Sequence, residues 1–146
     1  MLKKLVVLLL VIVSLFTIAG CGGKDDKVTV GILVTATHSA LNDAKDGFIE
    51  ALKAKGYENA EFVVKNPEGD QTTMNTMATD LVRKSDIVLG VGTPAAVALQ
   101  SARDSEQIDI TVLFTAVTDP ISAGLMTDAA GLHEDGFGSF YTSYDE

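Results

Sequence analysis

The chain has 146 residues, which is the length of a single domain of ordinary size. Its hydrophobic content of 47% is typical of a globular protein and argues against a disordered or fibrous chain. The 20 acidic and 11 basic side chains give a net charge of -9, which repels phosphate backbones, so no nucleic acid partner is predicted.

The N-terminal segment has the features of an export signal. Two lysines near the start precede an apolar run from Leu5 to Ala19 that only two polar residues interrupt. The run is shorter than the roughly 20 residues that a membrane-spanning helix needs. Residues 1–20 are therefore predicted to be a signal peptide that takes no part in the fold.

The signal ends at Ile18-Ala19-Gly20-Cys21, where small residues precede the single cysteine of the chain. A lone thiol has no partner for an internal disulfide. The segment resembles the lipobox of bacterial lipoproteins, whose cysteine is lipidated and becomes the mature N-terminus. The resemblance implies an exported protein, anchored through Cys21 at the outer face of the cell membrane or in the periplasm, with residues 21–27 as a tether. The alternative is a plain secretory signal with an incidental cysteine.

A strand and a helix follow the tether. Residues 28–34 form a nearly continuous apolar run, which is typical of a strand buried on both faces. In residues 39–55 apolar side chains recur at helical spacing, and Gly56 follows at the position of a left-handed cap. The side chains expected to face the sheet are Leu41, Ala44, Phe48, Ala51 and Leu52.

The alternation of strands and helices continues along the chain. Further strands are predicted at residues 61–65, 87–91 and 110–117, and further helices at residues 71–84 and 94–103. Strands that alternate with helices need right-handed crossovers and a sheet covered on both sides. The predicted fold class is α/β, a doubly wound parallel sheet of the Rossmann or flavodoxin type in the order β-α-β-α-β-α-β.

In such a sheet every strand-to-helix loop lies at the carboxyl edge, where ligands bind. The predicted edge consists of residues 35–40, 66–71, 92–94 and 118–120. Thr93-Pro94 and Asp119-Pro120 each place a capping side chain before a proline that begins a helix. Helix starts of this kind offer free N–H groups and partial positive charge to an anion.

These residues predict a site for a small zwitterion. The helix starts and the hydroxyls of Thr37 and Ser39 would hold a carboxylate, and Asp119 would pair with an ammonium group. The competing interpretation is that these residues are ordinary helix caps without a ligand. His38 is expected to be a loop residue, and the acidic segment 133–135 lacks a second group at metal spacing, so no metal and no cofactor are predicted.

Four segments together resemble the solute-binding lipoproteins of ABC importers, in the branch linked to tryptophan and tyrosine uptake. They are VTVGILVTATHSALNDAKDGFIEALKAKGY, NPEGDQTTMNTMA, GVGTPAAVAL and LFTAVTDPISAGL, and they cover residues 28–125. The resemblance implies one lobe of a two-lobed periplasmic binding protein that has no enzymatic activity, captures an amino acid-like solute, aromatic or other, and delivers it to a membrane permease. The contacts implied by matching position are Thr37, His38, Ser39, Leu41, Thr93, Ala95, Thr118 and Asp119.

The resemblance ends near Leu125, whereas members of the family are usually at least twice as long. It therefore implies a chain truncated to most of the first lobe, with the second lobe missing. A single lobe is expected to bind its solute weakly or not at all, because closure of two lobes holds the ligand. Residues 126–146 contain no Lys or Arg, and glycine, serine and threonine fill the gaps between their aromatic residues, which predicts a divergent, disordered tail; a partner surface is the alternative.

Two other functions compete with solute binding. The segment Gly90-Val-Gly-Thr-Pro-Ala95 fits the dinucleotide fingerprint G-x-G-x-x-A. It follows the third strand rather than the first, however, and Pro94 removes an amide that a pyrophosphate would need. The remaining alternative is an exported flavodoxin-like regulatory or nucleotide-binding module, although residues 34–37 lack the acidic cluster that a receiver needs for magnesium.

Overall fold

A computed structural model describes residues 27–126 of the chain. In chain order the elements are β1 (Thr29–Val34), α2 (Ser39–Ala54), β2 (Glu61–Lys65), α3 (Gln71–Lys84), β3 (Ile87–Val91), α4 (Thr93–Glu106) and β4 (Thr111–Thr115). The predicted signal peptide, Cys21 and nearly all of the predicted tail lie outside these residues. Within the described range, no helix is both long and apolar enough to cross a membrane.

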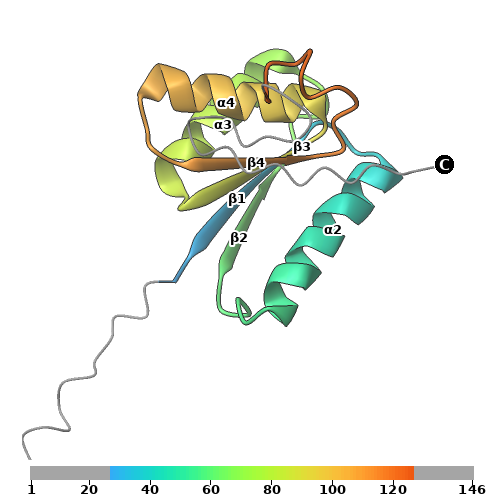
Figure 1. The fold of residues 1–146 in the computed structure, drawn as a ribbon, viewed down its shortest axis with the longest axis vertical. Helices are drawn as coiled ribbons and strands as arrows, with labels where there is room; N and C mark the ends of the chain where they lie inside the picture. Colours follow the sequence, from blue (N-terminus) through green and yellow to red (C-terminus); the bar gives the residue numbers. More distant parts are fainter. Residues whose placement is uncertain (1–26, 127–146) are drawn as a thin grey trace, which may run out of the picture.

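The four strands form one parallel sheet in the order β2-β1-β3-β4 (Figure 1). This confirms the predicted alternation of strands and helices. Val34 of β1 lies beside Val91 of β3, which in turn lies beside Thr115 of β4. Because these three strands end at the same level, the loops that follow them share one edge of the sheet.

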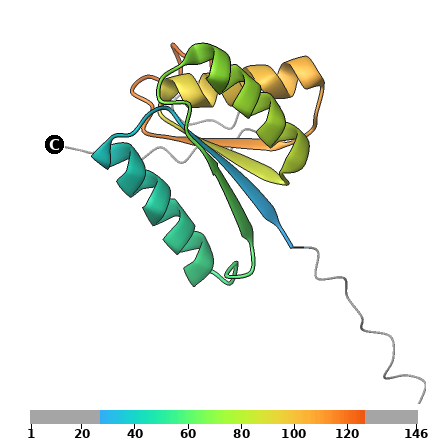
Figure 2. The ribbon, with the colours of Figure 1, turned by 180° about the vertical axis from the view of Figure 1, so that it is seen from behind.

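The helices cover both faces of the sheet, as the doubly wound prediction requires. α3 and α4 lie on one face and α2 on the other (Figures 1 and 2). The central strands β1 and β3 are apolar on both sides because each side packs against a helix layer. The largest fully buried side chains between the sheet and the α3–α4 layer are Leu33, Met74, Leu81, Leu99, Phe114 and Leu125, and those on the α2 side are Ile32, Val34 and Leu89.

α4 packs directly on the sheet. A Cβ atom added to Gly90 of β3 would lie 2.5 Å from the Cα atom of Ala96, so only glycine leaves room for the helix backbone at this point. Four alanines of the helix are buried against the sheet and α3, namely Ala95, Ala96, Ala98 and Ala102. These small side chains let the helix pack close to the sheet.

The C-terminal part of the lobe differs from the prediction in two ways. β4 ends at Thr115 rather than at residue 117, because Ala116 adopts a left-handed φ of 56° that a strand does not accommodate. No helix follows Pro120 within the described residues. The chain forms a turn instead, in which the Leu125 amide donates to the Pro120 carbonyl at 2.8 Å, and Gly124 has a φ of 72°.

α2 is less deeply buried than the other two helices. None of its residues is fully buried, whereas α4 has five that are. Leu41, Ala44, Phe48 and Leu52 pack partly buried against the sheet as predicted. Ala51 is exposed, and Ile49 takes its place on the packed face, so the inward side of this helix is rotated slightly from the predicted one.

Candidate functional site

The carboxyl edge of the sheet is the candidate site, and its centre lies between β1 and β3. β1 leads into α2 on one face, and β3 leads into α4 on the other. The strand order therefore reverses between these two neighbours, and a crevice opens beyond such a switch point. The loops after β2 and β4 flank it, because β2 pairs with β1 and β4 with β3.

Thr35 joins the loops at this switch point. Its hydroxyl donates to the Val91 carbonyl at 3.0 Å and accepts from the Ala95 amide at 3.4 Å. Its carbonyl accepts from the Gly69 amide at 2.9 Å. One residue thus connects the end of β1 to β3, to the start of α4 and to the loop after β2. Thr35 lies within the predicted edge but is not one of the predicted ligand contacts, although its position directly after a buried strand was a usable signal.

The start of α4 is built differently from the prediction. The N-cap is Gly92, with φ 93° and ψ 152°, and no side chain of its own caps the helix. Thr93 is the first helical residue rather than the cap, so its predicted capping role is wrong. A Cβ atom at position 92 would lie 2.6 Å from Thr35 Oγ1, so the hydroxyl of Thr35 uses the space that a side chain would fill.

Thr93 and Ala95 differ in their access to the edge. Thr93 is partly exposed, whereas Ala95 is fully buried beneath it. The Ala95 amide is already bonded to Thr35. Contact of a ligand with either residue remains a prediction, and for Ala95 it would need a rearrangement of that bond.

Thr37 is held by the loop after β2. Its amide donates to Glu68 Oε2 at 3.0 Å, and its hydroxyl donates to Glu68 Oε1 at 2.5 Å. Asn66 Nδ2 donates both to Thr37 Oγ1 at 3.0 Å and to Glu68 Oε1 at 2.8 Å. The Thr37 hydroxyl and then its amide hold the pKa of the Glu68 carboxyl below its ordinary value of 4.5.

The start of α2 also departs from the prediction. His38 is the N-cap, and its Nδ1 accepts from the Ala40 amide at 3.3 Å, whereas Ser39 is the first helical residue. The expected loop position of His38 is therefore correct, but Ser39 is not the cap. His38 and Ser39 are exposed at the edge, and Leu41 is partly buried with its side chain in the core under α2.

Thr118 and Asp119 are exposed in the loop after β4. Asp119 accepts from the Ser122 amide at 3.0 Å and from the Ser122 hydroxyl at 2.6 Å. The Ser122 hydroxyl and then its amide lower the pKa of the Asp119 carboxyl below 3.8. Asp119 thus caps the turn after Pro120 rather than a helix, and its predicted pairing with an ammonium group remains a prediction.

The family of the chain follows from its sequence. Residues 29–131 match the profile of ABC transporter substrate binding proteins, and this match contains every loop of the carboxyl edge described above. The chain belongs to the ABC transporter substrate-binding protein family.

Relatives of this substrate-binding protein agree in sequence and in fold. The tyrosine-binding protein of Clostridioides difficile (strain R20291) is 38% identical over 101 residues, which cover 66% of this chain and 28% of that protein. The solved ABC domain from Streptococcus pneumoniae in complex with L-Trp is 35% identical with a TM-score of 0.64, covering 70% of this chain and 35% of that one. An open, ligand-free substrate-binding protein with adhesive properties from Clostridium difficile is 32% identical with a TM-score of 0.63, over 69% and 34% of the two chains.

The chain thus spans about a third of the length of these relatives. The comparisons confirm the family resemblance of the four segments and the α/β lobe that it implied. The family is one of substrate-binding proteins of transporters and is not an enzyme family.

The dinucleotide fingerprint of this substrate-binding protein has a structural explanation. Gly90 is required by the close approach of Ala96, and Gly92 by its positive φ and by Thr35. The Ala95 amide, which a phosphate would need, is bonded to Thr35. Within residues 27–126 no group of three or more His, Cys, Asp or Glu side chains could hold a metal ion.

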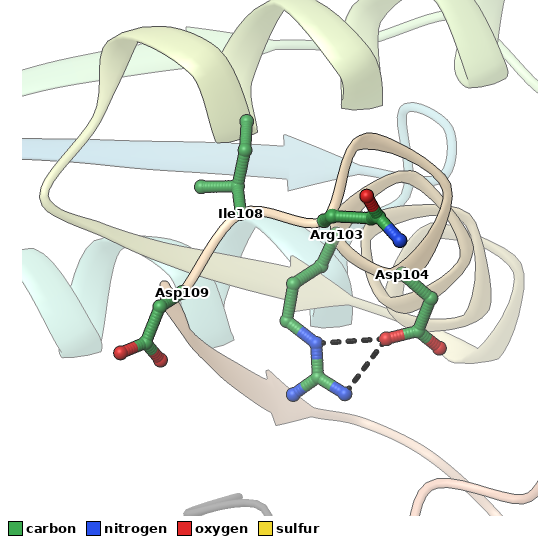
Figure 3. Close-up of a pocket in the computed structure, with 5 residues that line it drawn as sticks. Arg103, Asp104, Ile108 and Asp109 are labelled. Atoms are coloured by element: carbon green, nitrogen blue, oxygen red, sulfur yellow. Dashed lines mark hydrogen bonds and ion pairs between the residues drawn. The ribbon is translucent and has the colours of Figure 1, made fainter.

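A hollow of about 400 Å³ lies away from the carboxyl edge, between the end of α4 and the start of β4. Figure 3 shows Arg103 and Asp104 in its lining, joined by two hydrogen bonds of 3.0 and 2.9 Å, with Ile108 and Asp109 beside them. The hollow is wide open to solvent, and the guanidinium of Arg103 already donates to the Asp104 carboxylate. It lies at the amino end of β4, the opposite end from the switch point, and we assign it no role in solute binding.

Proposed function

We propose that this chain is the solute-capturing component of an ABC importer, takes up a small amino acid-like solute at the carboxyl edge, and delivers it to a membrane permease. Aromatic amino acids are the first candidates, because one relative is named for tyrosine and another was solved with L-Trp. The role is binding rather than catalysis. The observation that carries the proposal is the family match over residues 29–131, together with the gathering of four loops at one switch point.

The proposed site consists of Thr37, His38, Ser39, Leu41, Thr93, Ala95, Thr118 and Asp119. The partly positive group that the site offers is the N-terminus of α4, where Thr93 is partly exposed. A carboxylate fits this end of the site. The acceptors of the loops after β1 and β2 suit the ammonium end of the same solute.

The proposal extends to the parts of the chain outside the described residues. Residues 1–20 would be the lipoprotein signal peptide, Cys21 the lipidated residue, residues 21–27 the tether, residues 28–125 the first lobe and residues 126–146 a divergent tail. The protein would then be exported and lipid-anchored at the outer face of the cell membrane, or in the periplasm where an outer membrane exists.

Isothermal titration calorimetry of the chain from residue 22 onward with L-Trp, L-Tyr and L-Phe tests the solute proposal. One lobe offers one side of a two-lobed clamp, so we expect a dissociation constant of about 1 mM, equivalent to about -4 kcal/mol. Binding in the micromolar range would contradict the half-clamp hypothesis. Equal heats for glycine and the aromatic amino acids would contradict the proposed preference.

A further inference from the structure

We propose that Glu68 is a positioning residue that orients Thr37, so that this corner of the site presents hydrogen-bond acceptors to the solute. The inference rests on the proposed function and deepens it, because it says which end of a zwitterionic solute lies at the loops after β1 and β2. Glu68 was not among the residues that sequence reasoning selected.

The hydrogen bonds of the Glu68 carboxylate are with Thr37 and Asn66. Its two carboxylate oxygens accept from the amide and the hydroxyl of Thr37, at 3.0 and 2.5 Å, and from Asn66 Nδ2 at 2.8 Å. Asn66 Oδ1 in turn accepts from the Glu68 amide at 2.9 Å. Glu68 belongs to none of the ion pairs found among residues 27–126, so its charge is engaged by neutral donors only.

The backbone of Glu68 is held in an unfavourable conformation. Its φ is 51°, in the left-handed region that side chains other than those of Asn and Asp rarely adopt. It belongs to the turn that the Asp70 amide closes by donating to the Pro67 carbonyl at 3.0 Å, and Gly69 beside it also has a positive φ, of 80°. Here it aims the carboxylate across to Thr37, which is 31 residues away in sequence.

The donors of Thr37 are used up by this arrangement. A threonine has one hydroxyl proton and one amide proton, and Glu68 accepts both. The hydroxyl oxygen also accepts from Asn66 Nδ2, which leaves it with one free lone pair. The predicted role of the Thr37 hydroxyl as a carboxylate donor is therefore not available while Glu68 is in place.

The polarity of this corner follows from which donors and acceptors of Thr37 and Glu68 are already used. Thr37 and Glu68 present oxygen lone pairs and a negative charge, which attract an ammonium group and repel a carboxylate. The solute would therefore lie with its ammonium end toward the loops after β1 and β2, rather than toward Asp119 as first predicted, and with its carboxylate toward the start of α4.

The first experiment needs no solute. Amide hydrogen exchange of Thr37 is measured by NMR in the full chain in mild detergent, for the wild type, Glu68→Gly and Glu68→Gln. Glycine adopts the φ of position 68 without strain, so Glu68→Gly removes the carboxylate without burdening the fold. We expect Thr37 to exchange at least about tenfold faster in Glu68→Gly, as for the loss of a hydrogen bond to a charged group. Glu58→Gln, an exposed acid in the loop before β2, is the matched control and should leave the rate unchanged.

The second experiment reads the polarity with the same variants. Tryptamine carries the ammonium group without the carboxylate, and indole-3-propionate carries the carboxylate without the ammonium group. In Glu68→Gly we expect weaker tryptamine binding by at least about threefold, roughly 0.7 kcal/mol, and indole-3-propionate binding that is unchanged or tighter.

The outcomes separate this inference from the proposed function. Unchanged Thr37 exchange in Glu68→Gly overturns the positioning role, whatever the solute results. Faster exchange with weaker indole-3-propionate binding and unaltered tryptamine binding overturns the assigned polarity. Faster exchange in a chain whose wild type binds none of the tested compounds supports the positioning of Thr37 and counts against the proposed function instead.

Discussion

At the residue scale, the carboxyl edge depends on side chains that connect loops rather than on the caps that the sequence suggested. Thr35 and Glu68 each bridge loops that are far apart in the chain. The residues expected to cap helices, Thr93 and Ser39, are instead the first residues of those helices. An ordinary threonine or glutamate therefore gains importance only from what the fold places opposite it.

Replacement of Thr35 by valine is predicted to destabilise the lobe by about 1 kcal/mol. Valine has the same shape but no hydroxyl, so the Val91 carbonyl and the Ala95 amide each lose a partner in a partly buried position. Thr35→Ser keeps the hydroxyl and is the matched control. Urea unfolding followed by circular dichroism measures both, and equal stability of the two variants would contradict the bridging role.

Acidification is predicted to weaken the local hydrogen bonds that the exposed carboxylates accept. The pKa values of Glu68, Asp70 and Asp119 lie below their ordinary values, because hydroxyl and amide donors of Thr37, Thr73 and Ser122 bond to the charged forms. A depressed folded-state pKa adds stability that is present above the unfolded-state pKa and is lost as the pH falls through the folded-state value.

The urea midpoint should therefore be constant near neutral pH and should decrease below about pH 4.5. Most of the donors are neutral, so high salt should change this decrease little. A midpoint that rises on acidification would contradict the assignment. The triple variant Glu68→Gln, Asp70→Asn and Asp119→Asn should show a smaller decrease between pH 5 and about pH 3.

At the element scale, α4 is the helix on which the site depends most. It begins on a glycine with positive φ, packs five buried residues against the sheet and α3, and starts directly over β3 through Gly90. α2 contrasts with it, because it has no fully buried residue. The position of the α4 N-terminus relative to β1 is thus set by close backbone packing, whereas α2 is held by one partly buried flank.

Gly92→Ala is predicted to destabilise the lobe by about 2 kcal/mol or more. The new Cβ atom would have an unfavourable φ of 93° and would lie 2.6 Å from Thr35 Oγ1. Gly56→Ala is the matched control, because Gly56 has a similar φ of 99° but open space around its missing Cβ atom. Comparison of the thermal unfolding of the two variants isolates the steric clash with Thr35. Equal losses of stability would show that the strain of the positive φ alone accounts for the destabilisation.

At the scale of the whole molecule, the described residues form one lobe with a four-stranded parallel sheet and a single switch point. Tyrosine and tryptophan are candidate solutes only because of relatives of this chain. The chain spans about a third of the length of those relatives. The proposed attachment to the membrane depends on Cys21, which lies outside the described residues.

Cys21→Ser is predicted to release the protein from the membrane fraction of expressing cells. Serine cannot carry the thioether-linked lipid that the lipobox resemblance implies, and stable anchoring needs the lipid chains. Fractionation followed by immunoblotting measures the distribution. Ser14→Ala, a change within the predicted signal that leaves the cysteine intact, is the control, and an unchanged distribution of Cys21→Ser would favour the plain secretory signal.

The sequence by itself determined the order of strands and helices, the parallel sheet and the edge on which the loops gather. Each of these follows from local periodicity, from the apolar runs of strands buried on both faces, and from the handedness of crossovers. It also indicated the family, because four segments resemble members of the family in the right order. These features depend on residues close together in the chain or on simple alternation.

Only the tertiary structure decided which side chains meet at the edge. The partners of Thr35 are 56 and 60 residues away, and Glu68 reaches Thr37 across 31 residues, so no local pattern contains these bonds. The same holds for Gly92, whose missing side chain leaves space for Thr35. Helix caps could be assigned wrongly from sequence because a threonine before a proline is compatible with two positions, and the neighbouring strand selects one of them.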